Sequence, residues 1–349
     1  MNRHRLGHVP QSHALLRRAG ITGRGLIVAC VLTAVAFSAT ACASSAPKKK
    51  DTNGNGDKVF TVGYSQSNNA EPYRAQLNKQ LQFFVKKYKN LKLLSITDAH
   101  QSSATQVSQV QNFIQQNVDV LIVSPNEPDP LTAPVEAACA KKIPVIILDR
   151  SVNTDCYASF IGGDNVAAGK KAGELAVQAL PNGGNVVELQ GILSDQPQID
   201  RDKGFREAIA ANPKIKIIQH REAKWLKPNA TTIMQQWLQQ GQKIDLVYGE
   251  NDPMALGAYL AAAGMNKEKQ IKFIGTDGLA IPDGGIRAVQ QGQLAGTFVY
   301  PTCAQEAADT AEALVTGKSV QKKQTLDITA VTPNNAAELY TKYSSEASG

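Results

Sequence analysis

A buried-strand pattern that ends in polar side chains occurs four times and most constrains how this chain can fold. The apolar run 143–148 is followed at once by Asp149 and Arg150. These two opposite charges are costly to bury unless they form hydrogen bonds with another polar group. Three further apolar runs end in the same way, at 62–65, 246–252 and 273–277. Ligands of open α/β sheets lie at the carboxyl ends of the strands, so these polar tips predict a binding site for a small molecule.

Strand-like and helix-like segments alternate from Lys58 onward, which is the pattern of βαβ units and predicts parallel sheets. The expected strands are residues 59–65, 91–97, 118–123, 143–148, 159–161, 185–190, 214–219, 245–248, 272–275, 295–300 and 325–329. The expected helices are residues 72–89, 103–116, 129–141, 199–211, 229–240, 253–263, 281–290, 305–315 and 335–344. We therefore expect an α/β fold of two doubly wound parallel-sheet lobes with a deep cleft between them.

The first forty-one residues have the composition of an export signal. Five arginines and no acid precede or flank an apolar run from Leu26 to about Ala41, which is too short and wrongly flanked for a stable membrane span. Ala39-Thr-Ala-Cys42 is similar to a lipobox, so we expect residues 1–41 to be removed and Cys42 to be lipidated. Cleavage by an ordinary signal peptidase is the alternative. Residues 42–57 then form a flexible tether.

The charge of the chain is concentrated in this signal. The whole chain carries a net charge of +7, with 37 basic and 30 acidic residues. Removing the five arginines before Cys42 leaves 32 basic residues against 30 acidic ones. Nothing in that balance indicates a nucleic-acid partner.

Three cysteines remain after the signal and the anchor are set aside. Cys139 and Cys156 lie close in sequence, and an exported protein permits a disulfide between them. Cys303 would then be a free, buried thiol. The histidines are isolated and the cysteine spacings match no metal motif, so we expect no metal and no cofactor.

Seven sequence blocks in order carry a resemblance to a known family. They are residues 62–66, 144–150, 163–165, 186–191, 199–205, 251–258 and 275–278. Over about residues 59–317 the chain resembles the type I periplasmic sugar-binding proteins of ABC transporters, nearest to the ribose- and galactofuranose-binding members. The resemblance implies a three-segment hinge, with crossings near 162–165, 299–302 and 321–324. It implies a first lobe of residues 58–163 plus 301–323, and a second lobe of residues 164–300 plus 324–349.

The resemblance also implies ligand residues. Asp149 and Arg150 would bind adjacent sugar hydroxyls; the alternative is a charge pair that caps the following loop. Asn251 would reach the sugar with its amide, whereas Asp252 would be the N-cap of the following helix. Asp277 would accept hydroxyl protons from the far side of the cleft, unless it serves only the Asp-Gly turn.

Five more residues complete the expected ligand set. Arg201 matches a family arginine but has a structural alternative. The indole of Trp225 would stack on a sugar ring, with core burial as the alternative. Tyr73 and Arg74 follow a polar loop similar to that of galactofuranose binders, and Gln66 is a further contact. Arginine at position 74 makes the pocket more polar, and could suit a larger or an acidic sugar.

The expected function is therefore capture of a monosaccharide and its delivery to an ABC permease. The protein would be a monomer, anchored by lipid at the outer face of the cytoplasmic membrane. A sensory role, in which the bound state is read by a membrane receptor, shares every feature. No Gly-x-Ser-x-Gly or Gly-x-Gly-x-x-Gly motif is present, so we expect no enzyme. An export signal stands where a repressor would need its helix-turn-helix.

Overall fold

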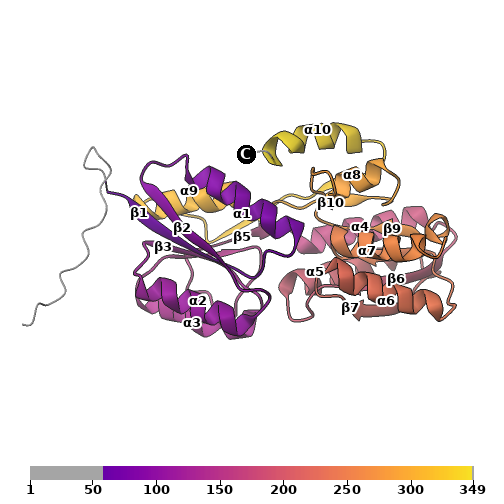
Figure 1. Cartoon of the computed structure of the whole chain (residues 1–349), viewed down its shortest axis with the longest axis horizontal. Helices are drawn as coiled ribbons and strands as arrows, with labels where there is room; N and C mark the ends of the chain where they lie inside the picture. The colour runs from indigo at the N-terminus through magenta and orange to yellow at the C-terminus, as the bar shows by residue number, and fades with distance from the viewer. Residues whose placement is uncertain (1–57, 348–349) are drawn as a thin grey trace, which may run out of the picture. The chain divides into compact units, whose positions relative to one another are not determined.

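Two parallel sheets covered by helices make up residues 58–347, the part of the chain that the computed structural model describes (Figure 1). The expected signal at residues 1–41, the lipidation site Cys42 and the tether at 42–57 lie outside the described residues. None of the described helices is both long and apolar enough to cross a membrane.

The first lobe contains a six-stranded sheet of order β11-β5-β4-β3-β1-β2 in which every pairing is parallel. Its strands are β1 (Phe60–Gln66), β2 (Leu91–Asp98), β3 (Val120–Ser124), β4 (Val145–Leu148), β5 (Ser159–Gly163) and β11 (Lys323–Leu326). Helices α1 (Pro72–Val85) and α9 (Ala304–Val315) cover one face, and α2 (Ser103–Gln115) and α3 (Pro128–Ala140) cover the other. All residues of β3 and β4 are buried, because both faces of these strands are covered.

The second lobe contains a four-stranded parallel sheet of order β7-β6-β8-β9. Its strands are β6 (Gly184–Gln190), β7 (Ile215–Glu222), β8 (Leu246–Gly249) and β9 (Lys272–Ile274), and an antiparallel pair, β10 (Thr297–Val299) and β12 (Thr329–Val331), lies beside them. Its helices are α4 (Asn165–Ala179), α5 (Gln196–Ile209), α6 (Lys227–Gln239), α7 (Asp252–Ala263), α8 (Gly285–Gln290) and α10 (Ala336–Ala347), with a 3-10 turn at Glu268–Gln270. The expected α/β fold with parallel sheets is confirmed.

Helices α4 and α5 approach each other unusually closely, because glycines face backbone at their contact. A Cβ on Gly169 would lie 2.1 Å from the carbonyl oxygen of Arg201, and one on Gly204 would lie 2.2 Å from that of Val166. The contact therefore fixes the turn of α5 that carries Arg201.

The chain passes between the two sheets at three places. The first two crossings follow β5 and β10, close to the expected positions. The third lies at Asp327 and Ile328 rather than at 321–324, because β11 still pairs with β5 through Leu326. The single strand expected at 325–329 is thus two strands in different sheets, and the expected lobe boundary after residue 323 cuts through β11.

A disulfide joins Cys139 at the end of α3 to Cys156 in the loop before β5, and Cys303 is a buried free thiol. The bridge ties a surface helix to the segment that leads from Arg150 to the first crossing.

Candidate functional site

Ten residues from both lobes line one cavity. They are Glu71, Tyr73, Arg74, Asp149 and Arg150 from the first lobe, and Pro197, Arg201, Trp225, Asn251 and Asp277 from the second. The first group lies where β1 and β4 end, and most of the second group follows β6, β7, β8 and β9. The carboxyl ends of the strands of both sheets therefore meet at one site, as the strand pattern predicts.

Arg74 and Asp149 form a buried ion pair in the first-lobe wall. Nη2 of Arg74 lies 2.6 Å from Oδ2 of Asp149, and the two side chains are 2% and 4% exposed. Nη1 of Arg74 donates to Oγ of Ser124 at 2.8 Å. Burial alone would lower the pKa of Arg74, but Asp149 and Glu71 outweigh it and raise that pKa. Arg74 is therefore a cation although its side chain is only 2% exposed.

Asp149 has a left-handed backbone, with φ of 68°, at the sharp turn after β4. Non-glycine residues seldom adopt this conformation, although aspartate does so more readily than most. The turn directs Asp149 to Arg74 and leaves Arg150 directed at the opposite lobe.

Arg150 reaches across the cleft. Its Nη1 donates to the carbonyl oxygen of Asn126 at 3.2 Å and lies 3.2 Å from Oδ2 of Asp195 in the second lobe. Its Nη2 lies 3.7 Å from Oε1 of Glu71. Its Nε has no hydrogen-bond partner among the described residues. Because donors remain free at the cavity wall, Arg150 retains the capacity to bind a ligand hydroxyl.

Arg201 stands in the second-lobe wall and is held by α4 and β8. Its Nε donates to Oδ1 of Asn165 at 2.9 Å, and its Nη1 donates to the carbonyl oxygen of Glu250 at 2.6 Å. The guanidinium carbon lies 4.6 Å from the ring centre of Tyr300 and 5.5 Å from that of Trp225. Arg201 thus has structural partners and also lines the cavity, and its role as a ligand residue stays a prediction.

Trp225 is 3% exposed and still lines the cavity. Its ring lies against the backbone of Gly191, where a Cβ would be 2.0 Å from the indole. The guanidinium of Arg150 lies 5.8 Å from the ring centre, on the same indole that Arg201 approaches. Its Nε1 donates to Oδ2 of Asp195 at 3.0 Å.

The N-cap of α7 is Asn251 and not Asp252, contrary to the expectation. Oδ1 of Asn251 accepts from the backbone N–H of Met254, so Asn251 is the N-cap of α7. Its Nδ2 donates to the carbonyl oxygen of Trp225 at 3.1 Å. Asp252 instead accepts from Thr297 and from the backbone N–H of Gly278. The expectation for Asp252 is wrong because its carboxylate is bonded by Thr297 of β10 and by the backbone N–H of Gly278, not by the helix end.

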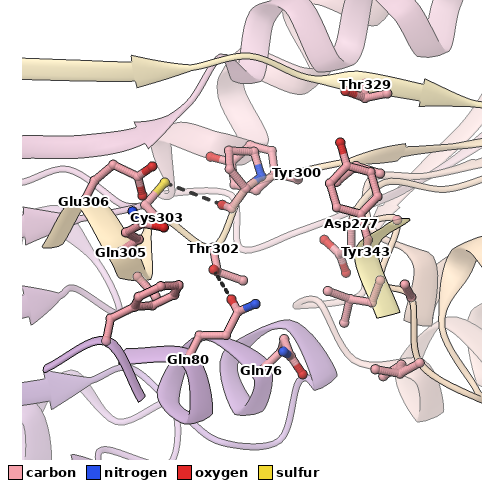
Figure 2. A pocket seen from close by; sticks show the side chains of 18 of the residues that line it. Gln76, Gln80, Asp277, Tyr300, Thr302, Cys303, Gln305, Glu306, Thr329 and Tyr343 are labelled. Atoms are coloured by element: carbon pink, nitrogen blue, oxygen red, sulfur yellow. Dashed lines mark hydrogen bonds between the residues drawn. The ribbon is translucent and has the colours of Figure 1, made fainter. Parts of the chain in front are cut away.

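Asp277 stands between this cavity and a second one at the hinge. Burial, with the nearby carboxylate of Asp252, raises its pKa well above the usual range. The second cavity, of about 480 Å³, is lined by the crossings, α1 and the end of α10, and Figure 2 shows Asp277 and Tyr300 on its wall. Asp277 also lines the first cavity, where its carboxyl group can hydrogen-bond a ligand hydroxyl.

Two more of the expected ligand residues have partners inside the protein. Tyr73 lines the cavity with its ring, while its hydroxyl donates to the carbonyl oxygen of Pro301 at 2.9 Å and its ring meets that of Tyr300 edge-on. Gln66 is absent from the cavity wall. Its amide donates to Tyr64 and Asn78 and accepts from Ser67, so the structure does not bring Gln66 to the site.

Two carboxylates at the site were not predicted from the sequence. Glu71 lies beside Arg74 and Arg150, and Asp195 pairs with Arg150 from the opposite lobe. Both stand at the N-cap positions of helices, α1 and α5, and neither makes a side-chain capping bond. An acid before a helix is ordinarily read as a cap, so the sequence offered no signal that these two serve the cavity.

The charges around the cavity are close to balanced. Three arginines line it, and Glu71, Asp149 and Asp195 lie against two of them, Arg74 and Arg150. Burial raises the pKa of Asp195 to about 6, against the opposing effects of Arg150 and of the bond from Trp225. Two of the three cavity arginines, Arg74 and Arg150, are therefore paired with carboxylates, whereas Arg201 is held by the amide of Asn165 and the carbonyl oxygen of Glu250.

A second acidic cluster lies behind Arg201. Ligand atoms of Glu188, Asp202 and Glu250 lie within 4.8 Å of one another. Arg206 donates to Asp202 at 2.7 Å and to Glu188 at 2.9 Å, and burial raises the pKa of Glu188 and of Glu250. The arginine and retained protons account for this cluster without an ion.

Comparisons with known proteins agree with this geometry. A model of the periplasmic binding protein domain matches residues 62–319. The ribose import binding protein of Bacillus subtilis is 33% identical over 303 residues, covering 84% of this chain and 95% of that protein. The galactofuranose-binding protein of Escherichia coli is 32% identical over 279 residues, covering 76% and 86%.

Solved structures give the same result. The fructose-binding periplasmic domain of a hybrid two-component system superposes with a TM-score of 0.79 at 32% identity, covering 82% of this chain and 95% of that one. A galactofuranose-binding protein superposes with a TM-score of 0.78 at 28% identity, covering 82% and 99%. The expected resemblance is confirmed.

Proposed function

The chain belongs to the periplasmic binding protein family, with its type I α/β fold, and from this premise we propose that it captures a neutral monosaccharide between its lobes. The relatives named above are binding proteins, and we propose that this chain likewise catalyses no reaction. It would hand the sugar to an ABC permease.

The observation that carries this proposal is that one cavity takes polar side chains from both lobes. A ligand favours the closed state only by its differential affinity for that state, so contacts from both sides are required. Asp149 and Arg150 provide them on one side, and Arg201 and Asp277 on the other. Trp225 adds an apolar face for the C–H side of a sugar ring.

The three crossings supply the hinge of the proposed mechanism. Tyr300 ties two of them together, because its hydroxyl accepts from the backbone N–H of Gly163 at 3.2 Å and from the amide of Asn165 at 3.0 Å. The sugar would join one lobe, and the lobes would then close about these crossings.

The charge balance favours a neutral sugar over an acidic one. An additional carboxylate would enter beside Glu71, Asp149 and Asp195, which already pair with Arg74 and Arg150. The relatives bind ribose, galactofuranose and fructose by name, and we propose a sugar of this size for this chain.

The sequence of residues 1–42 supports a proposal about where the mature protein is located. We propose that the mature protein is a monomer held by lipid at the outer face of the cytoplasmic membrane. Metabolic labelling with an alkyne fatty acid tests the anchor: the wild type should be labelled, and a Cys42→Ser variant should not. Equal labelling of both would refute lipidation at this residue.

A thermal-shift panel on the chain from Ala43 tests the binding. It would contain D-ribose, D-fructose, D-galactose, xylitol, myo-inositol and D-galacturonate. A ligand at about a hundred times its dissociation constant adds roughly 2.7 kcal/mol. With an unfolding entropy of about 2.1 cal/mol/K per residue over roughly 290 residues, the expected shift is roughly 4 °C. A shift with galacturonate alone would refute the neutral-sugar proposal.

One relative favours a second candidate function. The fructose-binding domain cited above belongs to a hybrid two-component system, so a family member of the same fold serves sensing. Deleting the gene for this protein separates the two: loss of uptake of the bound sugar supports transport. Unchanged uptake, with loss of a transcriptional response when the binding protein is deleted, supports sensing.

A further inference from the structure

We propose that Asp195 is a positioning residue of the site, which orients Trp225 and Arg150 from the second lobe and makes their arrangement depend on closure. Only the sugar arm of its test rests on the proposed function.

Asp195 stands where an aspartate would ordinarily cap a helix, yet it does not. It precedes α5 in an extended conformation, and its side chain accepts no bond from the first turn of that helix. Capping would satisfy a free backbone N–H at little cost. The carboxylate is instead 1% exposed, and its Oδ2 accepts from the indole of Trp225 at 3.0 Å and lies 3.2 Å from Nη1 of Arg150.

One carboxylate oxygen thus joins residues that come from different lobes. Trp225 lies after β7 in the second lobe, and Arg150 lies after β4 in the first. The two contact each other as well, with the guanidinium carbon 5.8 Å from the ring centre. The contact of Asp195 with Arg150 is possible only when the lobes are together, because the two residues sit on opposite walls.

The backbone around Trp225 makes this anchor necessary. Lys224 and Trp225 have positive φ angles of 56° and 66°, so the turn that presents the indole is intrinsically unfavourable. Asn251 holds the carbonyl oxygen of Trp225, and Asp195 holds its ring nitrogen. Without Asp195, a buried indole N–H would lose its partner, and the ring would be free to turn away from the cavity.

The other oxygen of Asp195 has no hydrogen-bond partner among the described residues, although it is buried. A residue kept for stability alone would gain from using that oxygen at the helix end. Its orientation toward the two cavity residues indicates that it is placed for them.

The test uses tryptophan emission, which reports on the indole directly. The chain has two tryptophans, so a Trp237→Phe background leaves Trp225 alone. Asp195→Ser is the main variant: serine caps helices well, so α5 keeps its start, but its hydroxyl is too short to reach the indole. Asp195→Asn is the conservative variant, since its amide oxygen can still accept from Trp225. Ser194→Ala is the matched control, because Oγ of Ser194 donates across the lobes to Glu127 at 2.9 Å and touches neither cavity residue.

Without any sugar, Asp195→Ser should shift Trp225 emission to longer wavelength and increase its quenching by acrylamide severalfold, whereas Asp195→Asn and Ser194→Ala should match the background. With D-ribose, D-fructose or D-galactose, whichever shifts the melting temperature most, Asp195→Ser should weaken affinity at least tenfold and Ser194→Ala less than twofold. Unchanged emission and quenching in Asp195→Ser, with circular dichroism showing a folded protein, would overturn the positioning role. If no sugar binds but the emission shifts, the positioning of Trp225 stands and the proposed function fails.

Discussion

Replacing Arg74 by methionine should destabilise the protein strongly, because it leaves the buried carboxylate of Asp149 without its counterion. The Arg74–Asp149 pair is short, at 2.6 Å, and both side chains are almost fully buried. Removing one partner of such a pair costs about 3–5 kcal/mol, since the remaining charge keeps its desolvation penalty without its counterion. With an unfolding entropy of about 2.1 cal/mol/K per residue over roughly 290 residues, the melting temperature should fall by about 5–8 °C.

Urea unfolding followed by circular dichroism measures the cost, and two variants control it. Lys203→Met removes a positive charge from an exposed ion pair, in which Nζ of Lys203 lies 4.0 Å from Oε1 of Glu207 and the side chains are 62% and 56% exposed. It should change the free energy of unfolding by less than about 0.5 kcal/mol. Adding Asp149→Asn to Arg74→Met removes the stranded charge and should recover part of the loss. Asparagine also tolerates the left-handed backbone of position 149. A loss below about 1 kcal/mol in Arg74→Met, or no recovery in the double variant, would refute the reasoning.

Three other predictions test separate parts of the structure. Replacing Cys139 and Cys156 by serine opens a loop with a sequence separation of 17 and should lower the free energy of unfolding in urea by about 3 kcal/mol. A loss near zero would mean that the disulfide does not stabilise this segment. Gly169→Ala should destabilise by about 1–3 kcal/mol, since its Cβ would lie 2.1 Å from the carbonyl oxygen of Arg201. Gly264→Ala should not, because its Cβ would make only ordinary contacts, the nearest at 3.5 Å; equal melting temperatures for both would contradict the close α4–α5 contact. Burial raises the pKa of Asp195 to about 6 in the folded chain. The free energy of unfolding should therefore contain a contribution from Asp195 that is complete below about pH 4 and is lost as the pH rises through about 6, by up to about 3 kcal/mol. Asp195→Asn should remove this part of the pH profile of stability, and parallel profiles for the wild type and the variant would contradict it.

The sequence predicts the fold well because its signals are local and repeated. Fully apolar strands such as 145–148 can only be buried on both faces, and they recur between amphipathic helices. The third crossing was misplaced because the turn at Asp327 and Ile328 interrupts what reads as one strand. Which sheet each half joins depends on pairing with β5 or β10, and no local pattern encodes that choice.

The site was predicted where a charge has no local explanation. Asp149 and Arg150 follow a buried strand and have no helix to cap, so their place at the cavity could be inferred. Glu71 and Asp195 precede helices, where an acid has an ordinary role, and only the structure shows that they do not perform it. The cap was expected at Asp252 rather than at Asn251 for the same reason, because either residue type caps a helix and the choice depends on Thr297, a residue distant in sequence.

The central claim is that a sugar is bound between the two lobes through Arg150, and titration calorimetry tests it most directly. The sugar with the largest thermal shift would be titrated into the wild type, Arg150→Ala and Arg221→Ala, whose exposed side chain bonds Gln236 outside the cavity. Arg150→Ala should lose at least a hundredfold in affinity, and Arg221→Ala should bind as the wild type does. An unchanged dissociation constant in a folded Arg150→Ala protein would contradict it.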